Sequence, residues 1–179
     1  MKREQWQLWS AAISKAQCEA WIKKLKGELS MQKGGTFDNN KTEGARNTNI
    51  GWTNDPTINS TIANYGTEAN RNVFNYDINF YPTIQFGEYS KGCKYNWHHD
   101  VDWDSPKMID RKLSIVVQLS DPKKYDGGIF EFKHLPNPDK FIEQGSIIVF
   151  PSYQMHQVTE ITRGTRYSLV CWAEGPRWR

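Results

Sequence analysis

From about residue 73 onward, hydrophobic and polar residues alternate in short segments. In residues 73–80 and 112–120, every second position is apolar and most of the positions between are polar. Four further apolar segments follow, at residues 128–132, 146–150, 156–161 and 165–173, with glycine or proline turns between most of them. Strand side chains point alternately to the two faces of a sheet, so each segment predicts a short β-strand. Many short strands at this spacing predict a two-sheet sandwich or jelly roll.

The first 72 residues have a different pattern. Ser14 and Gln17 resemble a capping box, which predicts a helix that begins at Ser14 and ends near Leu29. Residues 36–70 are rich in Asn, Thr and Gly, and we expect loop there, with one short helix near residues 57–65. The expected fold is a β-dominated α+β domain over residues 1–179. Its helical and loop-rich part covers about 1–72 and its jelly-roll core about 73–174, with the N-terminal helices packed on one sheet.

Composition and charge narrow the class of protein. A chain of 179 residues with 37% hydrophobic residues is large enough for one domain with a real core. It contains no apolar run of about 20 residues and no apolar signal segment at the N-terminus, so we expect a cytoplasmic protein without a membrane partner. The net charge of +3 is too small to favour nucleic acid. The three cysteines, Cys18, Cys93 and Cys171, suggest neither a disulfide framework nor a zinc clamp.

A candidate metal site begins at His98 and Asp100. In an extended segment these two side chains point the same way and His99 points the opposite way. His156 follows the apolar segment 147–150 after a short corner and is the natural third ligand. Two histidines and one carboxylate on one side of an octahedron leave three positions open, as in non-haem iron(II) oxygenases. His99 and His134 are assigned to packing or to the surface.

Arg166 supports this interpretation of the site. If residues 162–164 form a hairpin loop, Glu160 opposes Arg166, while His156 and Arg166 share one face about 13 Å apart at roughly 3.3 Å per residue. That span fits a five-carbon diacid that chelates a metal at one end and pairs with the guanidinium at the other, assisted by Ser168. In the alternative interpretation, Arg166 is a surface residue paired with Glu160.

Together these motifs resemble one known family, the 2-oxoglutarate- and iron(II)-dependent oxygenases of the prolyl 4-hydroxylase type, and especially the PKHD-type hydroxylases. The resemblance runs from about Tyr89 to Trp172, roughly half of the chain. Its five blocks are, in order, Tyr95-x-Trp97-His98-x-Asp100; residues 111–120 leading to Asp121-Pro122-x-x-Tyr125-Asp126-Gly127-Gly128; Gly145-Ser146; Phe150-Pro151 with His156; and Arg166-Tyr167-Ser168.

The resemblance implies a double-stranded β-helix that uses iron(II), 2-oxoglutarate and dioxygen, with ascorbate as a candidate reductant. The implied reaction hydroxylates an unactivated C–H bond while 2-oxoglutarate is converted to succinate. The implied iron ligands are His98, Asp100 and His156, and Arg166 would bind the 5-carboxylate of 2-oxoglutarate. Residues expected near the cosubstrate are Tyr89, Tyr95, Ser168 and Gln118, the last at a position where some relatives have a tyrosine.

The substrate is predicted from the family alone as a prolyl residue in a peptide or protein. Trp97, Trp103 and residues 35–70, with Arg46 and Trp52, are candidates for the rim of the cavity or for packing. Three alternatives stay open. A nucleobase demethylase on the same scaffold is disfavoured because position 172 is tryptophan where those relatives have a second arginine. A zinc hydrolase lacks an evident base near the triad. A non-catalytic jelly-roll binding module would not need the complete triad plus Arg166.

Overall fold

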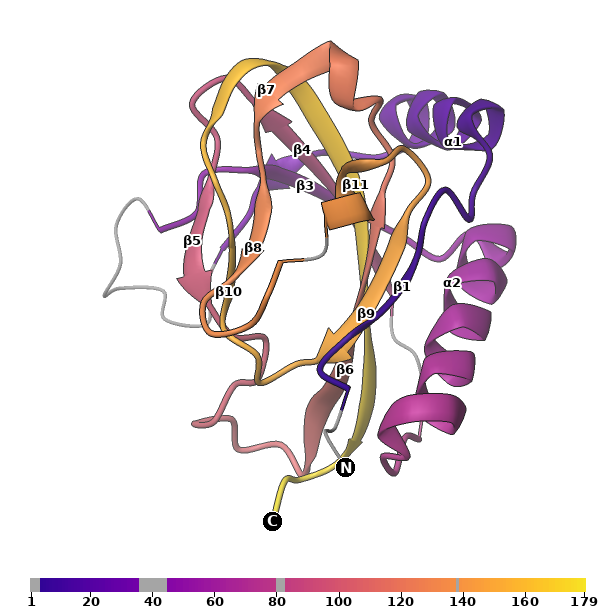
Figure 1. Ribbon diagram of the computed structural model, residues 1–179, viewed down its shortest axis with the longest axis vertical. Helices are drawn as coiled ribbons and strands as arrows, with labels where there is room; N and C mark the ends of the chain where they lie inside the picture. The colour runs from indigo at the N-terminus through magenta and orange to yellow at the C-terminus, as the bar shows by residue number, and fades with distance from the viewer. Residues whose placement is uncertain (1–3, 36–44, 80–82, 138) are drawn as a thin grey trace.

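Two antiparallel β-sheets form the body of the protein, which is described by a computed structural model over residues 4–35, 45–79, 83–137 and 139–179 (Figure 1). The larger sheet follows the order β1 (Gln7–Trp9), β9 (Ile147–Pro151), β6 (Ile109–Gln118), β11 (Ile161–Pro176), β4 (Ile84–Ser90), β3 (Asn49–Thr53) and β2 (Gln32–Lys33), with β7 (Tyr125–Gly127) also paired to β11. The smaller sheet follows the order β5 (Tyr95–His98), β10 (His156–Val158) and β8 (Phe130–Phe132). The predicted jelly roll is therefore confirmed.

Two long helices, α1 (Lys15–Glu28) and α2 (Pro56–Ala69), lie along the larger sheet on the side away from the smaller one (Figure 1). The Ser14 hydroxyl accepts a hydrogen bond from the Gln17 amide at 3.2 Å, so the predicted cap does begin α1. The Asp55 carboxylate caps α2 through the amides of Thr57 and Ile58. The prediction of helices packed on one sheet is thus confirmed, and α2 is longer than expected.

Alternation within the central strands produces two separate cores. In β11, Leu169, Cys171 and Ala173 face the helices, in a core that also contains Leu25 and Ile58. The residues between them face the smaller sheet and line a cavity there. Strand β11 lies in the middle of the larger sheet, between β6 and β4. One face of a central strand therefore stabilises the fold and the other builds the candidate site.

The strand predicted at residues 73–80 is wrong as far as the structure describes it. Asn70–Phe74 form a π-helical turn, and Phe80 lies outside the described residues. Residues 75–79 form no strand, although the Asn79 amide donates to the Glu174 carbonyl oxygen of β11. The Asn70 side chain hydrogen bonds to both the amide and the carbonyl of Tyr76, and Asn75 has a left-handed φ of 53°. These asparagine interactions turn the chain locally. The alternating aromatic residues are explained by packing, because Phe74 and Tyr76 lie against the core beneath the helices.

The hairpin predicted at residues 162–164 is also wrong. These residues lie inside β11, where Arg163 pairs with Asp126 of β7, while β10 belongs to the smaller sheet and pairs with β5 and β8. A second missed feature is β3, which lies in the segment expected to be loop. Strands β1, β2 and β3 all come from the N-terminal part of the chain, so the larger sheet is built from both predicted parts.

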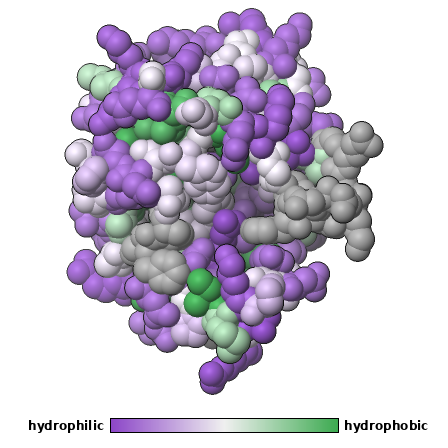
Figure 2. Space-filling view, turned by 180° about the vertical axis from the view of Figure 1, so that it is seen from behind, coloured by the Kyte–Doolittle hydropathy of each residue, from purple (hydrophilic) through white to green (hydrophobic). Residues whose placement is uncertain are grey.

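A helix that spans a membrane must be both long and apolar. None of the helices in the described ranges is both long and apolar enough to cross a bilayer. The face seen in Figure 2 is mainly hydrophilic, and its hydrophobic residues form only small patches.

Two glycines with left-handed backbones provide a matched test of the packing. Gly145 has φ +85°, and a Cβ there would lie 1.8 Å from the Ile13 carbonyl oxygen, whereas Gly92 has φ +83° and open space. We expect Gly92→Ala to lower the free energy of unfolding by about 1–2 kcal/mol, the conformational cost alone. Gly145→Ala should cost more than about 3 kcal/mol, because backbone must move as well. Urea unfolding measures both, and equal losses would contradict the close approach of residue 13 to Gly145.

Candidate active site

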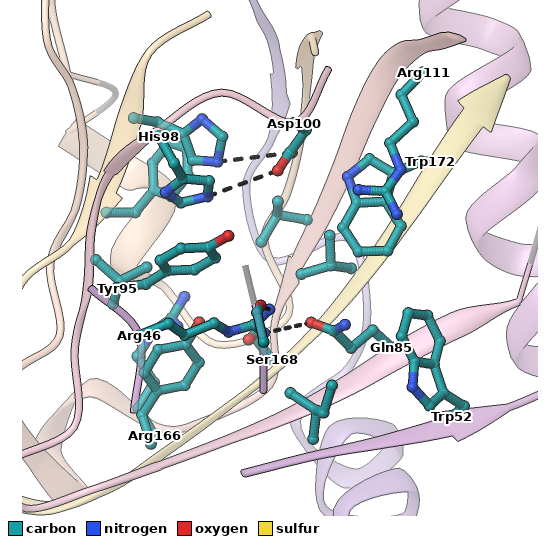
Figure 3. Close-up of a pocket in the computed structure, with 18 residues that line it drawn as sticks. Arg46, Trp52, Gln85, Tyr95, His98, Asp100, Arg111, Arg166, Ser168 and Trp172 are labelled. Atoms are coloured by element: carbon teal, nitrogen blue, oxygen red, sulfur yellow. Dashed lines mark hydrogen bonds and ion pairs between the residues drawn. The ribbon is translucent and has the colours of Figure 1, made fainter. Parts of the chain in front are cut away.

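The three predicted metal ligands come together at one end of the smaller sheet, where β5 ends and β10 begins. His98 ends β5, Asp100 follows two residues later, and His156 begins β10, directly opposite His98 in the antiparallel pair. One ligand atom from each residue can be chosen so that all three lie within 4.8 Å of one another. The Nε2 atoms of His98 and His156 lie 3.6 Å and 3.7 Å from the two carboxylate oxygens of Asp100 (Figure 3).

Backbone carbonyls determine the protonation of both imidazoles. The Nδ1 of His98 lies 2.7 Å from the Asn96 carbonyl oxygen, and the Nδ1 of His156 lies 2.8 Å from the Gln154 carbonyl oxygen. A carbonyl oxygen only accepts, so each Nδ1 carries the proton and each Nε2 of a neutral ring presents its lone pair to Asp100. Two lone pairs facing a carboxylate repel it unless a cation lies between them. This donor set therefore fits a metal ion, with both rings oriented for binding.

Two serines that the sequence analysis missed hold the carboxylate. The Ser114 hydroxyl donates to Asp100 Oδ2 at 2.6 Å and lies 3.0 Å from the Ser152 hydroxyl. Since Ser114 has only one proton to donate, Ser152 is the donor in the second bond. The Asp100 amide also donates to the Ser152 carbonyl oxygen. All three residues are buried, so Asp100 is fixed in direction before any metal binds. The available signal was a serine at position 114, between the apolar residues 113 and 115.

Electrostatics favour the forms of these side chains that bind metals. Burial and the neighbouring His156 hold the pKa of His98 well below its ordinary value, which keeps its imidazole neutral. Burial alone would raise the pKa of Asp100, but the two histidines, Arg111 and the Ser114 hydroxyl together hold it below its usual range. Asp100 is therefore ionised as a carboxylate.

Arg166 lies in the same cavity, on the cavity face of β11. Only 2% of the residue is exposed, and it is the largest side chain among the fully buried ones described. It opposes Tyr89 of β4 rather than Glu160, and its guanidinium carbon lies 5.5 Å from the centre of the Tyr89 ring. In the described part of the chain, no carboxylate lies within ion-pair distance of it. The alternative of a surface pair with Glu160 is therefore wrong.

The cavity that joins these groups has a volume of about 230 Å³ and lies between the two sheets. His156, Arg166 and Ser168 line it, as expected from the sequence, although the strand pairing used to argue for that face was wrong. Val170, on the same face of β11, lines it as well. Apolar side chains form part of its wall, and the triad, three arginines (Arg46, Arg111 and Arg166) and several other polar side chains form the rest. That combination is typical of small-molecule sites.

The remaining predicted residues are placed unequally. Tyr89 and Tyr95 line the cavity, and the Tyr95 ring stacks on His98 with centroids 3.4 Å apart. Gln118 opposes Ser168 in the sheet, but its amide donates to the Tyr125 hydroxyl and the Ser120 carbonyl oxygen, and it is not among the residues that line the cavity. A contact between Gln118 and a cosubstrate stays a prediction.

Only some of the residues predicted at the rim of the cavity line it. Arg46 and Trp52, from the segment of residues 35–70, line the cavity, whereas Trp97 and Trp103 do not. The Trp52 ring lies 6.3 Å from the ring of Trp172, which also lines the cavity. Gln85 and Arg111 also line the cavity, and no sequence pattern had indicated either of them. Arg111 lies 3.7 Å over the Trp172 ring, and burial lowers its pKa.

Comparison with known proteins shows the family to which this chain belongs. Residues 84–174, just over half of the chain, match the family model described as the 2OG-Fe(II) oxygenase superfamily. The chain therefore belongs to this superfamily, which uses iron(II) and 2-oxoglutarate. The match includes all three candidate ligands and Arg166.

Curated relatives and solved structures point to the prolyl-hydroxylase type within it. A PKHD-type hydroxylase of Prochlorococcus marinus is 37% identical over 51% of this chain, and one of a Shewanella species is 30% identical over 54%. These matches span 41% and 44% of the relatives, so the chain covers about two fifths of their length. The resemblance to PKHD-type hydroxylases is thereby confirmed.

Two solved structures match along nearly the whole chain. A viral collagen prolyl hydroxylase of Paramecium Bursaria Chlorella virus-1 gives a TM-score of 0.76 at 17% identity, covering 96% of this chain and 97% of that one. A Pseudomonas putida prolyl-4-hydroxylase gives 0.73 at 18% identity, covering 97% and 94%. At these identities the likeness shows the fold, and the predicted double-stranded β-helix is confirmed.

Proposed function

We propose that this chain is a 2-oxoglutarate- and iron(II)-dependent dioxygenase that hydroxylates an unactivated C–H bond, most favourably of a prolyl residue in a peptide or protein. The observation that carries the proposal is one cavity that holds His98, His156, Asp100 and a buried Arg166 that has no ion-pair partner among the described residues. Bound iron(II) and 2-oxoglutarate would supply the oxidising chemistry, with dioxygen as the oxidant and succinate and carbon dioxide as products.

His98, Asp100 and His156 would hold iron(II) from one side. Their directions are set by the Asn96 and Gln154 carbonyls and by Ser114, as described above. A site whose side chains are already oriented in this way would need little rearrangement when metal binds.

Arg166 would bind the 5-carboxylate of 2-oxoglutarate through its planar, bidentate donors. Ser168 lies two residues further along the same face of β11, and Tyr89 lies opposite Arg166. Both offer a hydroxyl group near the same carboxylate. The buried guanidinium would then obtain the anionic partner that the described protein does not provide, which also fixes the orientation of the cosubstrate.

A prolyl substrate is supported by the relatives, because the solved structures that share this fold include named prolyl hydroxylases. The indole rings of Trp52 and Trp172 line the cavity, next to the apolar side chains of Ile50 and Val116. Such walls suit a small apolar ring and exclude water from the reacting C–H bond.

The test of this function measures succinate formed from 2-oxoglutarate by iron-loaded protein in air, with ascorbate present, first alone and then with proline-containing peptides. We expect slow formation alone, faster formation with an accepted peptide, and addition of one oxygen atom to that peptide by mass spectrometry. Binding of iron and 2-oxoglutarate without succinate across a broad peptide panel would favour a binding module. Succinate formation with no peptide hydroxylated would reject the prolyl substrate but keep the oxygenase.

Ser114→Ala tests the support of the metal site separately. Without its hydrogen bond, Asp100 loses orientation, and we expect iron(II) affinity to fall about 10–100-fold, as is typical for partners of metal ligands. Competition with a coloured chelator measures the affinity. Ser60→Ala, at an exposed position on α2, is the matched control and should leave the affinity unchanged. Unchanged affinity in Ser114→Ala would show that the Asp100 carboxylate needs no such support.

A further inference from the structure

A second guanidinium, that of Arg46, lies close to the candidate metal ligands. Arg46 precedes β3 and forms an isolated bridge with Tyr95. Its guanidinium carbon lies 4.5 Å from the centre of the Tyr95 ring, and that ring stacks on His98. In Figure 3 the Tyr95 ring lies between His98 and Arg46. Arg46 is thus separated from a candidate metal ligand by a single aromatic ring.

The Arg46 guanidinium is held in place by neutral groups. Its Nε donates to Thr48 Oγ1 at 2.8 Å, one Nη donates to Gln85 Oε1 at 2.6 Å, and the other Nη donates to the Gly35 carbonyl oxygen at 3.3 Å. An arginine has five N–H donors, so one proton on each Nη has no partner among the described residues. Nor does any described carboxylate lie within ion-pair distance of Arg46. The side chain is therefore positioned but not neutralised.

The positive charge of Arg46 is not balanced by a negative charge in the cavity. Asp100 is the one carboxylate among the described residues that line it. If the proposed function holds, the two charges of iron(II) and the charge of Arg166 are balanced by Asp100 and the two carboxylates of 2-oxoglutarate. Arg111 has a separate acidic neighbour, Glu174, whose charge opposes the lowering of the Arg111 pKa by burial. A fixed cation that remains unbalanced in a partly apolar cavity favours an anionic guest.

We propose that Arg46 binds a carboxylate of the prime substrate, so that the enzyme selects substrates with an acidic group close to the C–H bond that is hydroxylated. For a peptide this means aspartate or glutamate next to the target residue. The inference rests on the proposed function and extends it from the reaction to the choice of substrate. Trp52 and Trp172 would contact the apolar part of the same substrate, while Gln85 and Thr48 keep the guanidinium in position.

A carboxylate near Arg46 has two sources, the prime substrate and 2-oxoglutarate itself. Replacing Arg46 distinguishes the two sources, because it should change either the discrimination between peptides or the KM for 2-oxoglutarate. If Arg46 binds the substrate, Arg46→Gln leaves the KM for 2-oxoglutarate in peptide-free succinate formation unchanged. If it binds the cosubstrate, that KM rises and discrimination between peptides stays as it was.

The experiment uses two blocked tetrapeptides that contain proline, one with glutamate directly before the proline and one with glutamate directly after it. Each is compared with a partner peptide in which glutamine replaces that glutamate. Binding is measured by calorimetry with manganese(II) and 2-oxoglutarate present, so that no turnover is needed. We expect wild type to bind the better glutamate peptide roughly tenfold or more tightly than its glutamine partner, the size of one charge-assisted hydrogen bond. Arg46→Gln should bind both at the level of the glutamine peptide, and Arg46→Lys should keep part of the preference.

Arg163→Gln is the matched control, because Arg163 is an exposed arginine paired with Asp126 outside the cavity. It should keep the full preference for glutamate. The proposal is overturned if Arg46→Gln keeps that preference, if wild type shows none, or if wild type binds neither glutamate peptide. A preference that is lost in Arg46→Gln while no peptide is hydroxylated would support the anion site and reject the prolyl substrate. Absence of succinate under all conditions would count against the oxygenase itself.

Discussion

Replacing His156 with alanine is expected to abolish both iron(II) binding and succinate formation. His156 supplies one of the three candidate metal ligands found among the described residues. No other histidine, cysteine or carboxylate among the described residues that line the cavity could replace it. We expect the affinity for iron(II) to fall by more than about 100-fold, beyond the loss typical of a partner outside the ligand set. Competition with a chelator measures the affinity, and succinate formation measures the consequence.

His134→Ala is the control for this variant, because His134 is exposed on the loop after β8 and lies outside the cavity. Thermal unfolding of the metal-free proteins separates a binding defect from a folding defect, since the His156 ring also packs against Phe150. Iron binding in His156→Ala at the wild-type level would disprove the triad. Full activity with weakened binding would mean that His98 and Asp100 suffice.

Two of the three candidate ligands, His98 and Asp100, could be predicted together from the sequence because they are neighbours along the chain. The spacing of two between residues 98 and 100 placed both side chains on one side, although β5 ends at His98 and Asp100 lies in a bend where Ser114 and Ser152 hold it. Arg166 could be placed on the cavity face for the same reason, since its parity along β11 matches that of Ser168 and Val170. Both predictions use the period of a strand and need no knowledge of the pairing partner.

Features that depend on pairing between distant segments could not be predicted in this way. Gly164 does have a left-handed φ of 73°, but it serves an approach to Lys124 and Tyr125 and not a hairpin turn. The Ser114–Ser152 pair holds Asp100 across 38 residues of sequence, and no local pattern connects those two serines. Arg46 reaches the cavity only because β3 joins the sheet beside β4. Sequence periodicity predicts faces, whereas register and neighbours follow from the packing of the whole chain.

Arg166 shows what the candidate site costs the fold. A buried guanidinium without a carboxylate partner loses hydration that the described contacts replace only in part, through the Tyr89 ring. Every other residue at this depth in β11 is apolar or small. A charge kept here against that cost is best explained by an anionic ligand, and stability and cosubstrate binding should then respond in opposite directions to its removal.

Arg166→Met is therefore expected to raise the KM for 2-oxoglutarate by roughly 100-fold, because two charge-assisted hydrogen bonds are lost. It should also leave iron(II) affinity unchanged and hold or raise the melting temperature of the metal-free protein. Arg166→Lys keeps the charge but not the planar pair of donors, so its KM for 2-oxoglutarate should lie between those of wild type and Arg166→Met. Arg163→Gln, on the exposed part of the same strand, should change neither the KM for 2-oxoglutarate nor the affinity for iron(II). A steep fall in melting temperature for Arg166→Met, with the KM unchanged, would show instead that the guanidinium serves the packing of the two sheets.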